Sequence, residues 1–490
     1  MSVAIAMEPI MGRRRNNCRP DAGIFATTNF LLRLVLVIPV TTMVASVAQA
    51  AQWNVTPRVQ VEETINSNVF LAPVGAEESD RISQINPGLL VEADGSRLRL
   101  RMDYALQNVY YSRNAEHNES WQQLDSRAGV ELIRDALFLD ASALYTQQVV
   151  SSEEGIPQDN ASISDNRTNV ATMTVRPRLQ NRIAGVARAD FSYGLTQTNY
   201  DLDTVPDLRE TDVRGSMQSL NENNGFTWRI ASSYRKLEPD NDLDSQLGRV
   251  GFELQLPVAR RARFLLDGGR EDNVYHTGLG AEVERGGYWY AGLAWQPGRR
   301  LSAQARIGER FFGRSSSFSL MHQGKRWQWN VRYQEELEGS VRKIFPDEPA
   351  ASTALPLGEA RPGSDIFLQK NFTVDGVREY GKVRMAISAY DRRREFRTTD
   401  ENERVTGGSL NAMWRVAPKS RLGGTLTRQN EELRATTRRD ELLIYQLEAR
   451  RELWRGSELY ITRRYYRRDS TDSLSEYRQI VLSAGLSATF

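Results

Sequence analysis

The sequence predicts an all-β fold, a transmembrane antiparallel up-and-down β-barrel of about 22 strands, with 18 to 22 as the range. Apolar and polar residues alternate with a period of two along most of the chain. Short and long polar connections also alternate, and the last strand ends on an aromatic residue. Because each strand of a membrane barrel has only one apolar face, the mean hydropathy of −0.53 is compatible with this fold.

The N-terminus predicts an export signal. An arginine-rich start precedes the apolar run 34–47, and Ala48-Gln49-Ala50 forms a small-residue cleavage site before Ala51. A transmembrane anchor is the alternative, but Pro39 interrupts the run, which is shorter than the roughly 20 residues that a spanning helix needs. We therefore divide the chain into a signal peptide, 1–50, and a barrel, 51–490, with a long loop at 338–364. The true start codon stays open.

Removal of the signal leaves 59 of the 64 basic residues and 60 of the 62 acidic residues. A nearly neutral chain gives no support for nucleic-acid binding. Cys18 is the only cysteine and lies in the signal, so the mature chain has no disulfide and no thiol nucleophile.

Long alternating segments predict the strands. Leu98, Leu100 and Met102 share one face, while Arg99 and Arg101 occupy the other. The same pattern recurs at 124–132, 137–145, 187–195, 250–256, 301–307 and 383–389. The weakest strands are 211–220, 315–323 and 365–377. Many of the alternating segments reach about ten residues, which suits a tilted strand that crosses a bilayer.

Connections predict the orientation of the barrel. Short turns are expected at 94–96, 134–135, 180–181, 221–225, 297–299, 324–325 and 417–419. Longer connections are expected at 65–80, 150–168, 199–210, 273–284, 338–364 and 397–404. This asymmetry is typical of tight periplasmic turns and longer extracellular loops. The first strand follows the cleavage site directly, which leaves no room for a plug domain before it. The proline-rich segment 338–364 is expected to fold over or into the mouth.

The C-terminal strand carries an assembly signal. Its outward file is expected to contain Ile480, Leu482, Leu486 and the terminal Phe490. Such a file resembles the signal that the barrel-assembly machinery reads, although an ordinary edge strand is the alternative. Aromatic residues near strand ends predict girdles at the membrane interfaces, with general strand propensity as the alternative. The candidates are Trp53, Tyr110, Tyr111, Trp121, Tyr193, Trp228, Tyr288, Trp289, Tyr290, Trp295, Trp327, Trp329, Trp414 and Trp454.

If the apolar files face lipid, charged residues must line the lumen, where water makes their charges inexpensive. The residues expected there are Arg99, Arg101, Asp103, Arg176, Arg178, Arg188, Asp190, Arg249 and Arg306. They predict a wet channel with arginine ladders, of the kind that passes anionic or sugar solutes. The alternative is a solvated face whose charges neutralise one another, and both interpretations can hold together.

No catalytic, metal-binding or cofactor-binding constellation is recognisable. The three histidines are His117, His276 and His322, with the first two in predicted polar loops. None has a nucleophile elbow or a metal-spaced partner. Glycine pairs such as Gly268-Gly269 and Gly407-Gly408 are expected to relieve crowding at strand bends. We expect neither an enzyme nor a cofactor.

Two groups of local motifs carry a family resemblance. They are the opening Trp53-Asn-Val-Thr-Pro57 with the segment 63–73, and the hairpin 293–301 followed by 308–313. They resemble the outer-membrane proteins of exosortase (PEP-CTERM) and exopolysaccharide loci, which are related to β-barrel porins. The resemblance implies an outer-membrane role in exopolysaccharide-producing bacteria.

The leading hypothesis is a water-filled pore in the outer membrane of a Gram-negative bacterium, for export of exopolysaccharide or passage of small hydrophilic solutes. Its partners would be the lipid bilayer, the barrel-assembly machinery, and polysaccharide with its export proteins. Three alternatives remain: an occluded scaffolding barrel, a barrel enzyme acting on lipid or glycan, and a soluble extracellular β-protein.

Overall fold

The computed structural model describes residues 51–151, 154–157, 159–220, 225–241, 243–277, 280–339, 366–397, 402–433 and 437–490. The signal peptide expected at 1–50 lies outside these residues, as does the long loop expected at 338–364 except for its first two positions. The helices within the described part are two short 3-10 turns, η1 (Ala115–His117) and η2 (Ser473–Ser475). None of its helices is long and apolar enough to cross a membrane.

Twenty-two strands form one sheet within the described residues. The first eleven are β1 (Gln52–Asn66), β2 (Asp80–Asp94), β3 (Leu98–Tyr111), β4 (Glu119–Ile133), β5 (Leu137–Val149), β6 (Arg167–Ile183), β7 (Ala187–Tyr200), β8 (Leu208–Ser219), β9 (Thr227–Pro239), β10 (Ser245–Ala259) and β11 (Ala262–Thr277). The others are β12 (Gly280–Gly298), β13 (Leu301–Arg310), β14 (Gly313–Gln323), β15 (Trp327–Gly339), β16 (Ile366–Tyr380), β17 (Val383–Phe396), β18 (Asn402–Ala417), β19 (Ser420–Leu433), β20 (Arg438–Glu452), β21 (Ser457–Ser470) and β22 (Tyr477–Thr489).

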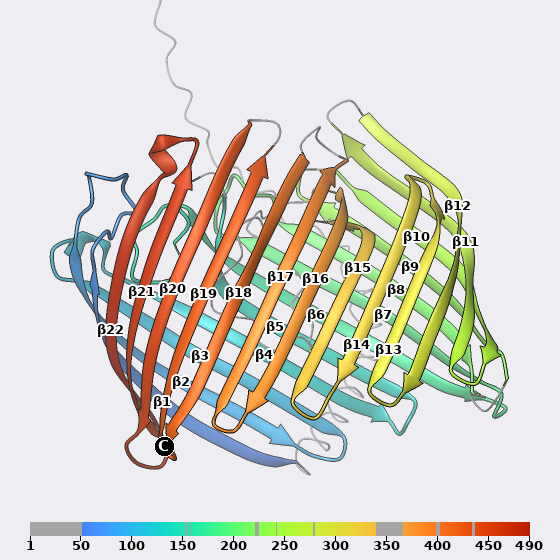
Figure 1. Ribbon diagram of the computed structural model, residues 1–490, viewed down its shortest axis with the longest axis horizontal. Helices are drawn as coiled ribbons and strands as arrows, with labels where there is room; N and C mark the ends of the chain where they lie inside the picture. The colour runs from blue at the N-terminus through green and yellow to red at the C-terminus, as the bar shows by residue number, and fades with distance from the viewer. Residues whose placement is uncertain are drawn as a thin grey trace, which may run out of the picture.

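The sheet closes on itself. Each strand pairs antiparallel with its neighbours in sequence, and β1 also pairs with β22, from Arg58↔Thr489 to Asn66↔Val481. Figure 1 shows the tilted strands wrapping around the barrel, with β1 beside β22 and the C-terminus at the end with the short turns. Closure satisfies the backbone groups of both outermost strands, which a bilayer would otherwise leave without hydrogen-bond partners. The predicted all-β, 22-strand barrel is confirmed, including the three weakest strands, which are β8, β14 and β16.

The described connections agree with the predicted asymmetry, with two corrections, while those expected at 221–225 and 397–404 lie partly outside the described residues. The expected turn at 180–181 is wrong, because β6 continues to Ile183 and the chain turns at Ala184 and Gly185, both with positive φ. The expected long loop at 273–284 is also wrong, because β11 and β12 extend through it and leave only 278–279 between them. Polarity had suggested a loop there, but an extended strand that rises above the membrane can be polar on both faces.

The outward face carries the apolar files. Met173 and Ile307 are more than 60% exposed, as lipid-facing side chains are when the bilayer is absent. In β22 the predicted file Ile480, Leu482 and Leu486 lies outward and alternates with a buried inward face, and the side chain of Phe490 is exposed as well. These apolar files and the closed sheet define an outer-membrane barrel.

Four of the predicted girdle residues do not face lipid. Tyr111, Trp121, Tyr288 and Tyr290 are buried on inward faces, with exposed fractions of 8% or less. Their inward parity follows from the register, since each lies beside an outward residue of the same strand. Trp53, Trp289, Trp295 and Trp414 are exposed on the outward face. Aromatic content alone could not separate the two groups.

The register of β6 generates a test with matched substitutions at adjacent positions. Val175, which is exposed outward, pairs with Ala141 and Leu195, whereas the inward Thr174 shares a 3.0 Å hydrogen bond with Thr196. We expect Val175→Arg to lower the free energy of unfolding by about 2–4 kcal/mol, because the guanidinium enters the lipid belt. Thr174→Arg should cost about 1 kcal/mol, since it enters a wet lumen and loses one neutral hydrogen bond.

Urea titration of the refolded barrel in lipid vesicles measures both values. Equal costs, or a larger cost for Thr174→Arg, would show that the assignment of faces in β6 is inverted.

Candidate functional site

The charged residues predicted to line the lumen lie on inward strand faces. In β3, Arg99, Arg101 and Asp103 alternate with the outward Leu100 and Met102. The other members of the set are Arg176 and Arg178 in β6, Arg188 and Asp190 in β7, Arg249 in β10 and Arg306 in β13. Contacts across several strands confirm the concave side, because Arg306 of β13 binds Glu253 of β10 at 3.0 Å.

Most of these charges are paired. Arg101 donates to Glu92 at 2.5 Å, and Arg178 lies 3.5 Å from Asp140. Asp103 accepts from Arg58 of β1. Arg99 has a longer 3.9 Å contact with Asp94, and Arg188 lies 3.2 Å from Asp190. Most of the set therefore has a partner of opposite charge within 4 Å, so neighbouring charges on this part of the wall offset one another.

Long inward side chains lie flat along the wall over glycines. Arg58 extends from β1 across Gly88 of β2 to Asp103 of β3. A Cβ at Gly88 would lie 2.6 Å from Arg58 Nε, so any larger residue at position 88 would clash with the Arg58 side chain. Tyr390 of β17 similarly passes over Gly407 to bind Gln429 of β19 at 2.8 Å.

The same arrangement recurs where β21, β22 and β1 meet. Tyr460 of β21 crosses Gly485 of β22, accepts a 2.6 Å hydrogen bond from Gln60 of β1 and donates to Glu62. A Cβ at Gly485 would overlap the Tyr460 ring. These glycines therefore make room for side chains that span two strands, rather than relieving bends.

A charged cavity of about 590 Å³ is lined by residues of β6–β12 and by Glu336 of β15. Four arginines and four acidic residues line it: Arg178, Arg214, Arg229, Arg249, Asp190, Glu253, Asp267 and Glu336. The ring of Tyr288 stacks under the Arg249 guanidinium, 4.1 Å from its centroid. Hydrogen-bond donors and acceptors thus alternate over this part of the wall with no excess of either charge.

The upper ends of β15 and β16 lie inside the barrel mouth. Ile366, Phe367 and Leu368 are consecutive and all buried, so both faces of this strand end are covered. Ile366 packs with Leu208 and Tyr275, which lie on the inward faces of β8 and β11. The described ends of these two strands therefore reach past the short β13–β14 hairpin to the inward faces of β8 and β11.

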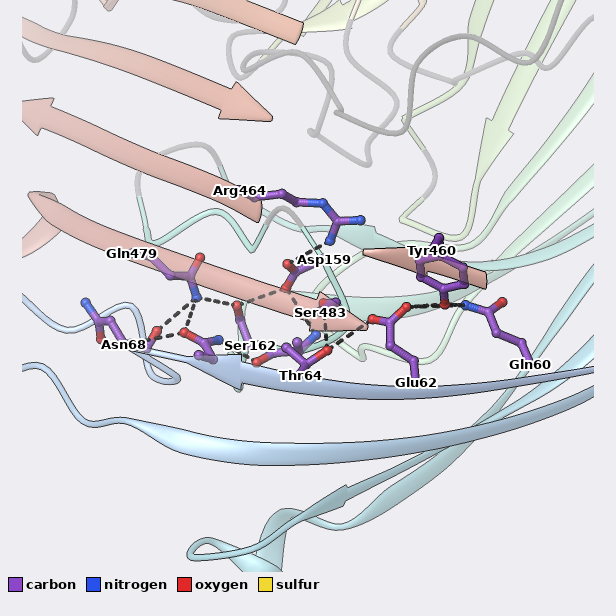
Figure 2. A network of polar contacts seen from close by, with 12 residues as sticks. Gln60, Glu62, Thr64, Asn68, Asp159, Ser162, Tyr460, Arg464, Gln479 and Ser483 are labelled. Atoms are coloured by element: carbon purple, nitrogen blue, oxygen red, sulfur yellow. Dashed lines mark hydrogen bonds and ion pairs between the residues drawn. The ribbon is translucent and has the colours of Figure 1, made fainter. Parts of the chain in front are cut away.

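The β5–β6 loop (150–166) also lies in the lumen. It was predicted as an ordinary long extracellular connection, and the sequence did not indicate its direction. Figure 2 shows part of it, Asp159 and Ser162, lying against side chains from β1, β21 and β22.

Polar contacts hold this loop to the inward wall. Gln479 of β22 donates to Ser162 Oγ at 2.8 Å (Figure 2). Asn66 of β1 donates to the Ala161 carbonyl at 2.6 Å. Arg464 of β21 lies 3.4 Å from Asp159. Further hydrogen bonds join Tyr477 to the Ile156 carbonyl, Arg468 to the Glu154 carbonyl and Asn160 to Gln107.

Two apolar clusters anchor the ends of the same loop. Ile156 is 2% exposed and packs with Tyr477 and Val481 of β22. Ala161 packs with Ile82 of β2 and Trp121 of β4. Trp121 faces inward because its side chain is part of the apolar surface on which the loop packs. The few apolar residues of this otherwise polar loop were the only signal in the sequence that it is anchored.

The histidines form no site in the described part of the chain. His117 packs edge-on against Phe70, with ring centroids 5.7 Å apart. His276 lies in β11 rather than in a loop, and its Nδ1 is 2.6 Å from the Asp244 carbonyl. His322 lies in β14. The described residues contain no group of three or more potential metal ligands.

Comparisons with known proteins show the fold. No protein-family model and no curated protein matches the chain. The FrpB iron transporter from Neisseria meningitidis (F5-1 variant) has a TM-score of 0.55 at 9% identity, covering 91% of this chain and 84% of that one. BauA, the ferric preacinetobactin receptor from Acinetobacter baumannii, has a TM-score of 0.50 at 10% identity, covering 89% and 80%. The chain is an outer-membrane β-barrel that resembles these large barrels in fold.

The Arg101–Glu92 pair generates a test of wall neutrality. If the pair cancels locally in an open lumen, Arg101→Gln should shift the reversal potential toward cations and Glu92→Gln toward anions, by similar amounts. The double variant should return to the wild-type value. Planar-bilayer recording across a salt gradient at low ionic strength measures this, because screening weakens the effect at high salt. Shifts in the same direction for both single variants would contradict local cancellation.

A second test asks whether the β5–β6 loop limits conductance. Val149 and Arg167 pair directly, so an Asn-Gly turn can join β5 to β6 in place of the loop. We expect the shortened barrel to conduct about twice as much current or more, because a constriction is removed. The control shortens the β7–β8 connection, 201–207, which should leave conductance unchanged. Unchanged conductance in both variants would show that the β5–β6 loop does not limit passage.

Proposed function

We propose that this barrel is an outer-membrane conduit for polyhydroxylated solutes, with export of an exopolysaccharide as its principal role and passage of small hydrophilic molecules as a consequence. The exopolysaccharide part rests on the resemblance of the 53–73 and 293–313 motifs to the PEP-CTERM-associated family. The conduit part rests on the lumen of the described residues. The proposal treats the chain as a transport protein and not as an enzyme.

The observation that carries the proposal is the chemistry of the wall. Paired guanidinium and carboxylate groups, such as Arg306 with Glu253, present donors and acceptors side by side without a net field. A sugar hydroxyl both donates and accepts, so it can exchange partners along such a wall. The tyrosines that lie flat, among them Tyr288 and Tyr460, add apolar ring surface that a pyranose face can contact.

The constriction supports selective rather than bulk passage. Barrels of 16 or more strands leave an aqueous interior. In this chain the β5–β6 loop and the ends of β15 and β16 occupy part of that interior. A narrowed lumen would retain periplasmic solutes while a single extended polymer passes.

An occluded scaffold is the second candidate, and the same inward elements favour it. If they close the lumen completely, the barrel would tether envelope machinery instead of conducting. The two solved barrels of similar fold are an iron transporter and a ferric preacinetobactin receptor, and these roles belong to those proteins. At 9–10% identity the shared fold carries no information about cargo.

Gene deletion with quantification of surface and periplasmic polysaccharide tests the proposal. We expect surface polymer to be lost and periplasmic polymer to accumulate, with both restored by the wild-type chain. In parallel, purified barrel in liposomes should admit neutral oligosaccharides, and more rapidly after shortening of the β5–β6 loop. A barrel that admits no sugar before or after shortening would support the scaffold. Normal surface polymer in the deletion strain would reject the export role.

A further inference from the structure

The short turns on one arc of the barrel are basic. The six turns within β10–β21 lie at 260–261, 299–300, 324–326, 381–382, 418–419 and 453–456, and they contain no Asp or Glu. Their basic residues are all exposed: Arg260, Arg261, Arg299, Arg300, Lys325, Arg326, Lys382, Lys419 and Arg455. At the opposite end, the loops 67–79, 201–207 and 471–476 contain acidic residues and no Lys or Arg. On this arc the end with the short turns, which faces the periplasm in this class of barrel, is therefore positively charged.

An outward aromatic row lies just inside these turns. Trp295 of β12, Trp327 of β15 and Trp414 of β18 are exposed, and each lies within five residues of a short turn. Outward tryptophans at strand ends mark the interface between hydrocarbon and headgroups. The basic residues of the turns lie beyond this row. They are therefore at the level of the headgroup phosphates of the periplasmic leaflet.

Between the β14–β15 and β16–β17 turns, rings and guanidinium groups form one outward stack. The rings of Trp327 and Trp329 are nearly parallel, with centroids 5.7 Å apart and 13° between their planes. Arg378 of β16 pairs with Trp327 in the register, and its guanidinium lies 4.3 Å from the centroid of that ring. The ring of Tyr380 lies 5.9 Å from the same guanidinium and 5.8 Å from that of Arg326. The stack therefore positions two cations around one tyrosine ring.

Gly376 gives Trp329 its place in this stack. The two residues pair in the register of β15 and β16, and a Cβ at position 376 would overlap the indole ring. Trp329 consequently lies over the backbone of β16 and supports the second indole, against which Arg378 packs. The geometry of the stack is thus fixed by the sheet.

The two guanidinium groups of the stack lack an anionic partner. Among the described residues, no hydrogen bond or ion pair involves the side chain of Arg326 or Arg378, and Nε of Arg378 is buried without a hydrogen-bond partner. The adjacent carboxylate, that of Glu379, is on the inward face and lies 3.9 Å from Arg384. The hydrogen-bond donors of both groups are therefore available to an external anion.

We propose that this stack binds the phosphodiester of an anionic phospholipid in the periplasmic leaflet, with an acyl chain along the two indoles. The bilayer already surrounds the stack, and guanidinium binds phosphate through two parallel hydrogen bonds. Lys325 and Lys382, on the two turns beside the stack, add positive charge, which favours a lipid of net negative charge over a zwitterionic one. The proposed site is on the outward surface and is independent of whether the barrel conducts.

Native mass spectrometry of the full refolded barrel tests the proposal, with acyl-matched phosphatidylglycerol and phosphatidylethanolamine as probes. We expect the wild type to retain phosphatidylglycerol more strongly. Arg378→Gln should weaken that retention about fivefold, and Arg326→Gln with Arg378→Gln about 25-fold, the loss expected for one and two basic residues at a membrane surface. Arg378→Lys should keep part of the preference, because it retains the charge and loses the planar stack.

Arg134→Gln is the matched control, because Arg134 is exposed in the β4–β5 turn at the same end and lies 3.8 Å from Asp135. It should retain phosphatidylglycerol as the wild type does, and the heat-modifiable mobility of each variant on gels verifies folding. Equal retention of the two lipids by the wild type would overturn the proposal. An equal loss in Arg134→Gln and Arg378→Gln would replace the site by diffuse attraction. Retention of polygalacturonate but not of phosphatidylglycerol, lost in Arg378→Gln, would assign the stack to an acidic polymer instead.

Discussion

Closure of β1 against β22 is the interaction on which the rest of the structure depends. Inside a bilayer an open strand edge has no water to satisfy it, so a sheet of this length is stable there only as a ring. Nine register pairs form the seam, from Arg58↔Thr489 to Asn66↔Val481. Side chains reinforce it from the inside, because Thr64 and Ser483 share a 2.8 Å hydrogen bond and Tyr460 reaches β1 over Gly485. The seam is therefore a packed inner surface as well as a backbone ladder.

The seam between β1 and β22 also binds the β5–β6 loop, which narrows the lumen. Gln479 of β22 donates to Ser162 of the β5–β6 loop (Figure 2) and also to Asn66 of β1, so one amide joins both sides of the seam to the loop. Asn66 in turn donates to the Ala161 carbonyl. Barrel closure thus creates the surface on which the loop docks. The seat cannot exist in a chain whose last strand has not yet paired, so the lumen acquires its narrow form only when the barrel is complete.

The period of two in the sequence was sufficient for the strands, for their faces and for the strand number, because each outward file must be apolar in lipid. It could not supply what depends on contacts between distant strands. Trp121 and Tyr288 are aromatic in either environment, and only the register shows that they face inward. The direction of the β5–β6 loop depends on partners more than 300 residues away, such as Gln479 and Tyr477. Local sequence does not identify such partners, nor does it identify the carboxylates that pair with the lumenal arginines, such as Glu253 with Arg306.

In the proposed conduit, selectivity should therefore depend on the constriction more than on the wall. The wall presents paired charges that cancel locally, and its long side chains lie flat over glycines such as Gly88 and Gly407. Two inward elements dock on different arcs: the β5–β6 loop on β20–β22 and β1–β4, and the ends of β15 and β16 on β8–β11. In the proposed conduit, these two elements narrow the lumen that the described residues enclose. Because the loop is held by hydrogen bonds and two small apolar clusters rather than by strand pairing, it can be removed without opening the barrel.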